Sequence, residues 1–201
     1  MKLVQAIAMG ESESALQLLK QSPELASASF AAGASRTGPK AFFLKPIGYY
    51  VYAGATALHV ASSAHHTAMV RRLIELGADV NARNRRGAAP LHAAAIGRPG
   101  DASFDPKAQA ATIACLIAAG ADPNAIDLSG VTALHRAVRT RSAAAVQALI
   151  DHGADVARKT KNGATALRLA RLTTGRSGSG SPEARAQQQR ILSVLAECGA
   201  R

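Results

Sequence analysis

The histidines are the residues whose type and spacing come nearest to a chemical site. His59, His92 and His135 each stand five residues after a glycine, in the patterns GATALH, GAAPLH and GVTALH. Imidazole nitrogens bind metals and transfer protons. Residues at one recurring position of a stack of helices are spaced by about the 10 Å width of a helix, whereas a metal such as zinc needs its ligands at about 2 Å. This spacing argues against a metal site.

Three aspartates recur in the same way, which could suggest an array of catalytic carboxylates. Asp79, Asp122 and Asp155 each follow a Gly-Ala pair, so the pattern fixes them as hydrogen-bonding residues of a loop. No Ser/His/Asp set, Cys/His set or phosphate-binding loop is found. The sequence therefore predicts no catalytic residue, no metal and no cofactor, and a protein that is not an enzyme.

Glycines show the repeat that positions these residues. Gly54 and Gly87 are 33 residues apart, as are Gly130 and Gly163, while Gly87 and Gly130 are 43 apart. The longer interval is the same period with an insertion of ten residues. A fixed period of this length is typical of stacked helical repeats.

Residues that start and stop helices recur with the same period. Thr56, Thr132 and Thr165 stand where a helix needs an N-cap, and Pro90 suits a first helical position. Each apolar run is followed by a glycine that suits a left-handed helix end. Because no single pair of helices can bury its apolar face, neighbouring pairs must stack into a solenoid. The closing glycines are Gly77, Gly120 and Gly153.

The recurring hexapeptide and the Gly-Ala-Asp ends resemble the Thr-Pro-Leu-His box and the repeat ends of the ankyrin repeat family. The resemblance covers residues 54–200 by motif and residues 2–28 weakly. It implies an all-α solenoid of helix-turn-helix units with hairpin-like loops, or fingers, that binds another protein. It also implies that the recurring histidine is a hydrogen-bonding strut within and between repeats, from which Arg168 departs.

The chain is interpreted as one domain, residues 1–201, made of five units. The units are a degenerate capping repeat (1–28) followed by an aromatic-rich inserted finger loop (29–53), repeat 2 (54–86), repeat 3 (87–129, with an insertion at 97–106), repeat 4 (130–162) and a C-terminal repeat (163–201, with a Gly/Ser insertion at 173–182).

The insertion at 29–53 holds six of the seven aromatic residues. These side chains either cover the core between the first two repeats, which we favour, or form an exposed contact surface, because tyrosine is enriched where partners bind. Tyr49 and Tyr50 lie on alternate faces of a short predicted strand, so we expect one in each role. The six are Phe30, Phe42, Phe43, Tyr49, Tyr50 and Tyr52.

The two later insertions suggest different roles. Asp105 and Pro106 predict the N-cap and first residue of a long outer helix over 107–119. The glycines and serines of 173–182 allow backbone N–H groups to converge, so Arg176, Ser179 and Ser181 are a candidate anion site. The alternative, which we favour, is a flexible linker.

Charge suggests the kind of partner. The net charge is +11, and from residue 131 onward there are 12 basic and 4 acidic residues. The resemblance implies a contact surface on the finger tips and on outward positions of the first helices, so the concave face should be basic with apolar patches. A partner with an acidic segment is favoured; the alternative is nucleic acid or a phosphate-containing ligand bound by the Arg-rich C-terminal repeats. The candidates are Arg85, Arg86, Leu128, Ser129, Lys161 and Asn162 on the fingers, and Val60, Ser63, Ile96, Arg136, Arg139, Leu169 and Leu172 on the helices, together with Tyr49 and Tyr50.

Apolar runs and cysteines indicate the compartment. No run approaches the ~20 residues that span a bilayer, and Gln5 interrupts the N-terminal apolar run, which argues against a signal peptide. Cys115 and Cys198 lie on different predicted outer helices, so no disulfide is expected. The sequence predicts a monomeric cytoplasmic protein without membrane contact.

Overall fold

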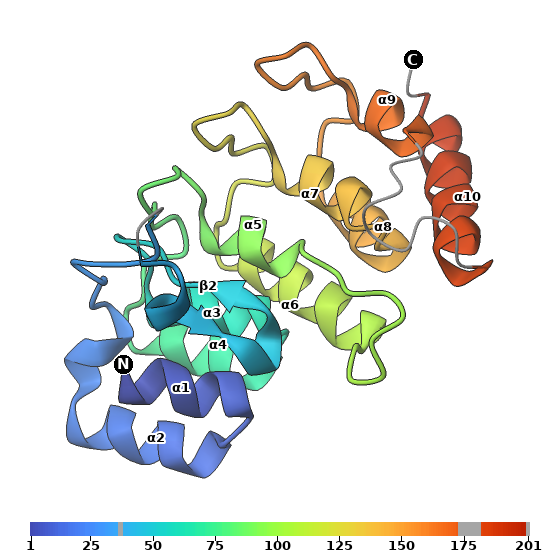
Figure 1. Cartoon of the computed structure of the whole chain (residues 1–201). Coiled ribbons are helices and arrows are strands. Elements are labelled where there is room, and N and C mark those ends of the chain that lie inside the picture. Colours follow the sequence, from blue (N-terminus) through green and yellow to red (C-terminus); the bar gives the residue numbers. More distant parts are fainter. Residues whose placement is uncertain (36–37, 173–181, 200–201) are drawn as a thin grey trace.

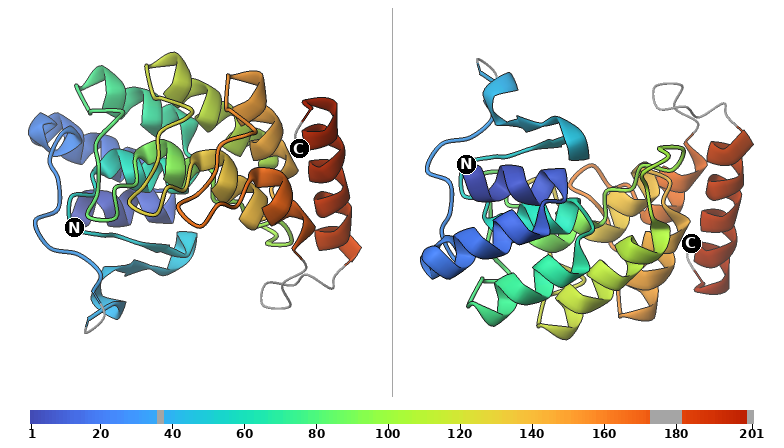
Figure 2. Two further views of the ribbon diagram at one scale, coloured as in Figure 1. Left: turned by 90° about the horizontal axis from the view of Figure 1, so that it is seen from above. Right: turned by 90° about the horizontal axis from the view of Figure 1, so that it is seen from below.

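The computed structural model describes residues 1–35, 38–172 and 182–199. Helix pairs stack side by side into a curved solenoid (Figure 1), with inner and outer helices in two layers (Figure 2). The inner helices are α1 (Lys2–Met9), α3 (Ala57–Ser63), α5 (Pro90–Ala94), α7 (Ala133–Arg139) and α9 (Ala166–Arg171). The outer helices are α2 (Ser12–Gln21), α4 (Thr67–Glu75), α6 (Pro106–Ala118), α8 (Ala143–Asp151) and α10 (Pro182–Glu197).

Short elements join these helices near the N-terminus. In the described ranges both strands lie before residue 54, so the predicted all-α solenoid is confirmed. The short elements are the 3₁₀ helices η1 (Pro23–Ala26), η2 (Lys40–Phe42) and η3 (Lys45–Ile47) and the strands β1 (Phe43–Leu44) and β2 (Tyr49–Tyr50).

Helix ends follow the predicted caps. Thr132 Oγ1 accepts a hydrogen bond from the backbone N–H of His135 at 3.3 Å, and Asp105 caps α6 by accepting from the N–H of Lys107 at 2.8 Å. Such bonds satisfy N–H groups that the first turn leaves without a partner. The predicted left-handed helix ends are confirmed, with φ of 85°, 94° and 88° at Gly77, Gly120 and Gly153.

The recurring histidines are struts between repeats, as the resemblance implied. Nδ1 of His59 accepts from the backbone N–H of Thr56 at 3.2 Å, so the ring proton is on Nε2, which donates to the Ala88 carbonyl at 3.0 Å. His92 and His135 repeat this pattern. Burial lowers the pKa of His59 to about 4. The ring is therefore neutral, as an accepting Nδ1 requires. At the equivalent position Arg168 is exposed.

The recurring aspartates are loop hydrogen-bonders, which confirms that interpretation. Asp79, Asp122 and Asp155 each accept from the backbone N–H two residues further on, at 2.8 Å. The next loop is then attached by an asparagine: Nδ2 of Asn81 donates to the Gly120 carbonyl at 3.0 Å. These bonds fix the loops in a regular stack.

The inserted finger loop packs against the inner helices, which corrects one expectation. Val60 and Ser63 were expected on the open concave face, but both are buried. The hairpin β1–β2 lies on the inner-helix side of the stack (Figure 2), and its Leu44 and Val51 join the hydrophobic core that contains Val60. The concave face is therefore covered at the N-terminal repeats.

Candidate binding groove

A pocket of about 660 Å³ lies where the hairpin, the fingers and the inner helices meet. We call it the groove. It brings together residues of the inserted loop (Gly48 to Tyr52), of two fingers, of the turn that follows α5, and of α7 with the turn after it. Seven of the predicted contact residues line it: Tyr49, Tyr50, Arg86, Ile96, Ser129, Arg136 and Arg139.

The remaining predicted finger residues lie outside this lining. Leu128 is 64% exposed, and Lys161 and Asn162 are also exposed. Backbone bonds connect consecutive fingers: the Leu128 N–H donates to the Arg86 carbonyl at 3.0 Å, and the Lys161 N–H donates to the Ser129 carbonyl at 3.1 Å. The fingers therefore form one continuous edge beside the groove.

Arg136 is not a free positive charge, which corrects the expectation that its charge simply adds to the basic face. Its Nη2 lies 2.9 Å from Asp127 Oδ2, and the two side chains are 20% and 8% exposed. The pair is partly shielded from water, so its electrostatic attraction is stronger than at an open surface. Arg136 joins α7 to the finger that precedes it.

Arg85 and Arg86 hold the inserted loop. Nη1 of Arg86 donates to the Tyr52 hydroxyl at 3.2 Å, and its guanidinium lies 5.2 Å from the centre of the Tyr52 ring. The Arg85 guanidinium lies 5.5 Å from the same ring, and Nη2 of Arg85 donates to the Ala34 carbonyl. Cation–π contacts of this kind attach the loop to the finger.

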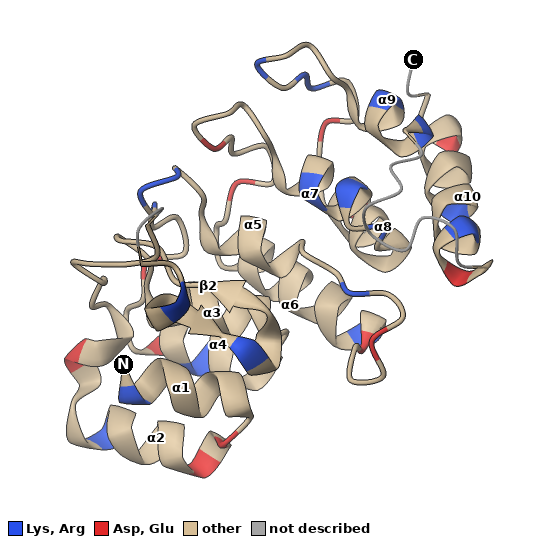
Figure 3. Ribbon diagram, viewed as in Figure 1, with Lys and Arg blue, Asp and Glu red and all other residues tan. Residues whose placement is uncertain are grey.

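Arg139 and Arg141 supply the positive charge at the far wall of the groove. Arg139 is exposed. Arg141, which sequence reasoning missed, is buried, with a left-handed φ of 57°. His65 occupies the equivalent position after α3 and has φ 54°. Aligning the repeats identifies this position from the sequence, but nothing in the sequence indicates that the arginine there is buried. Figure 3 shows the basic segments on the finger loops, α7, α9 and α10.

The aromatic residues of the inserted loop divide as predicted for Tyr49 and Tyr50. Tyr49 is buried, and burial raises the pKa of its hydroxyl above the usual range. Tyr50 is 39% exposed, and its ring centre lies 4.6 Å from that of Phe43. Both residues line the groove, but Tyr49 is buried in the core whereas Tyr50 is open to solvent.

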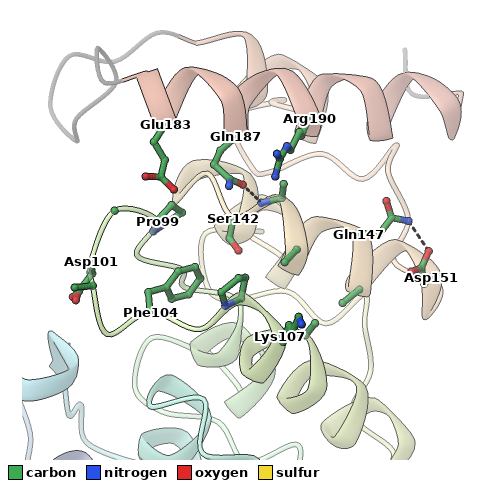
Figure 4. A pocket seen from close by; sticks show the side chains of 17 residues that line it. Pro99, Asp101, Phe104, Lys107, Ser142, Gln147, Asp151, Glu183, Gln187 and Arg190 are labelled. Carbon is green, nitrogen blue, oxygen red and sulfur yellow. Dashed lines mark hydrogen bonds between the residues drawn. The ribbon is translucent and has the colours of Figure 1, made fainter.

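A second pocket, of about 680 Å³, lies between the insertion at 97–106, α6, α8 and α10 (Figure 4). Both of its glutamines make bonds within the fold: Gln187 accepts from the Ala143 N–H at 3.2 Å, and Gln147 donates to Asp151 at 2.7 Å. Acidic and basic residues both line it. The candidate anion residues Arg176, Ser179 and Ser181 lie outside the described residues.

Metal sites and membrane-spanning helices are two other features that the described residues lack. In the part of the chain that the structure describes, no three His, Cys, Asp or Glu side chains are grouped so that they could hold a metal ion. Within the same residues, no helix has the length and apolar character needed to cross a membrane.

Comparison with protein families agrees with the fold. The family model described as ankyrin repeats (many copies) matches residues 50–94 and 116–170. The chain belongs to the ankyrin repeat family, whose members are generally protein–protein interaction modules. Among curated proteins, none matches the chain.

Proposed function

We propose that this protein is a non-enzymatic interaction module that binds an acidic segment of another protein in the groove. The observation that carries the proposal is the meeting of the exposed Arg139 with the half-buried Ile96 and the exposed ring of Tyr50 in one concavity. Aromatic residues and arginine are the types enriched at protein interfaces. In this proposal the chain acts as a cytoplasmic monomer without a cofactor.

The covered N-terminal part of the concave face limits where the partner lies. Because the hairpin occupies the inner side of α3, the segment runs from the Tyr50 ring toward α7 and α9. Leu128 at a finger tip adds an exposed apolar contact beside this path. A partner segment with acidic residues near an apolar side chain fits this arrangement.

A peptide selection tests this proposal. Random peptides displayed on phage would be selected on the wild-type protein, and the enriched sequences measured against Arg139→Glu. We expect acidic peptides whose affinity falls at least tenfold, about 1.4 kcal/mol, because the reversed charge repels them. Arg71→Glu, on the exposed face of α4, is the matched control and should change little. Enrichment of neutral or basic peptides, or equal binding to both variants, would contradict the proposal.

The alternative is binding of nucleic acid through the C-terminal repeats. Exposed basic residues there, Arg158, Lys159, Lys161, Arg168 and Arg171, are the observation in its favour. A labelled single-stranded DNA titrated at 50 and 200 mM salt distinguishes it. Counterion release would make the affinity for DNA fall steeply as the salt concentration rises. A lower affinity for DNA in Lys159→Glu than in the wild type would favour this alternative over binding in the groove.

A further inference from the structure

Arg141 is a buried arginine in the wall of the groove with one terminal nitrogen that has no partner. The residue is 8% exposed. Its Nη2 donates to the Leu172 carbonyl at 3.5 Å, while Nη1 is buried and bonds to no acceptor in the described ranges. None of the ion pairs found among those residues involves Arg141.

A structural role alone does not account for a charged side chain at this position. His65, its equivalent after α3, has nearly the same left-handed backbone and donates through Nε2 to the Ala94 carbonyl at 3.0 Å. An uncharged donor therefore suffices for the strut to the next repeat. Arg141 carries a positive charge, and a buried charge without a counter-charge is unfavourable.

The surroundings of Arg141 are also rich in positive charge. Among the described residues that line the groove there are five arginines and one acidic residue, Asp127. The Asp127 carboxylate is already paired with Arg136, at 2.9 Å, so it does not neutralise the charge of Arg141. The other lining arginines are Arg86, Arg98 and Arg139, of which Arg98 has a carboxylate nearby, with its Nη1 3.7 Å from Asp101 Oδ2. The groove therefore offers an excess of guanidinium groups to an anion.

We propose that the groove binds a small organic phosphate monoester, with its phosphoryl group held by Arg141 and Arg139. Because Nη1 of Arg141 is buried, binding requires the guanidinium to turn so that Nη1 meets a phosphoryl oxygen in the groove. A phosphoryl dianion matches two guanidinium groups better than a single carboxylate does, because it carries more charge and more acceptor oxygens. The volume of about 660 Å³ is in the range of small-molecule sites, and Tyr50 and Ile96 supply apolar contacts for the organic part. This site does not require a protein partner.

Phenyl phosphate is the probe, and binding is measured by isothermal titration calorimetry. Arg141→Gly removes the guanidinium at a backbone conformation that glycine adopts freely, so the variant should remain folded. We expect phenyl phosphate to bind the wild type, and Arg141→Gly and Arg139→Gln each to weaken it at least tenfold. His65→Gly makes the same backbone change at the equivalent position outside the groove and should bind as the wild type does. Circular dichroism melting checks that every variant is folded.

Two further ligands, inorganic phosphate and benzoate, test which part of phenyl phosphate the groove recognises. Inorganic phosphate should bind more weakly than phenyl phosphate, and benzoate more weakly still. Equal binding of inorganic phosphate would overturn the organic part of the proposal, and equal binding of benzoate would overturn the phosphoryl part. Absence of phenyl phosphate binding to the wild type, or undiminished binding to folded Arg141→Gly, would overturn the site itself.

Discussion

Arg136 on α7 reaches back to Asp127 in the preceding finger, with Nη2 and Oδ2 2.9 Å apart. Oδ1 of the same carboxylate accepts from the N–H groups of Ser129 at 2.8 Å and Val131 at 3.0 Å. Burial raises the pKa of Asp127, but the hydrogen bonds from Val131, Arg136 and Ser129 outweigh it and the net pKa is lowered. One carboxylate thus shapes the finger and attaches it to the helix that lines the groove.

This pairing makes the two arginines of α7 different in their effects on folding. We predict that Arg136→Glu lowers the free energy of unfolding by about 2–4 kcal/mol, because it places a second carboxylate beside a shielded one. Arg139→Glu should change it by no more than about 0.5 kcal/mol, since Arg139 is exposed. Urea unfolding of both variants provides the measurement. Similar midpoints for the two would show that the Arg136–Asp127 pair contributes little.

Core packing gives a second prediction. Leu73 on α4 and Leu149 on α8 are 0% exposed and occupy equivalent repeat positions. Replacing either with Ala should destabilise the fold by about 2–5 kcal/mol, from lost burial and the cavity that remains. Leu128→Ala is the matched control, because this leucine is 64% exposed, and it should shift the urea midpoint little. A comparable shift for all three would contradict the packing described above.

The histidine struts predict a pH dependence. Burial lowers the pKa of His59 and His92 to about 4, from an ordinary 6.5. As the pH falls below about 6.5, these two histidines bind protons in the unfolded chain but not in the folded chain. The stability that they contribute is therefore fully present above about pH 6.5 and is lost as the pH falls toward 4. The loss should be about 2 kcal/mol per ring by pH 5. Urea unfolding at pH 7.5, 6 and 5 measures it.

A variant without these rings is the control for that prediction. In His59→Gln with His92→Gln, the side-chain amide can still accept and donate a hydrogen bond but does not titrate in this range. The decline of stability with acidity should be shallower in this double variant. An unchanged slope would assign the acid sensitivity to other groups, namely the buried His65 and His135, whose pKa values are also lowered, or the carboxylates.

The repeat frame was predictable from the sequence because its signals are local. A threonine cap, a closing glycine such as Gly77 and a strut such as His59 each act within one or two repeats. The contacts of the insertions were less predictable. Val60 sits at an outward repeat position, yet it is buried in the hydrophobic cluster that also contains Leu44 of the inserted loop. Two other features were also unpredictable: the pairing of Arg136 with Asp127 and the burial of Arg141. They depend on the positions of a finger and a turn in three dimensions, which the spacing of residues in the sequence does not give.

The two adjacent tyrosines of β2 provide the last prediction. Tyr49 is 8% exposed and belongs to the core, whereas Tyr50 is 39% exposed at the groove. Tyr49→Ala should therefore destabilise the fold by about 3–5 kcal/mol, as expected for a buried aromatic residue. Tyr50→Ala should alter stability by less, about 1 kcal/mol, through its lost contact with Phe43. Its main effect should be weaker binding of the acidic peptides selected on the wild-type protein. Thermal melts and titrations of both variants separate the two roles, and a stable Tyr49→Ala protein would show that the inserted loop does not seal the core.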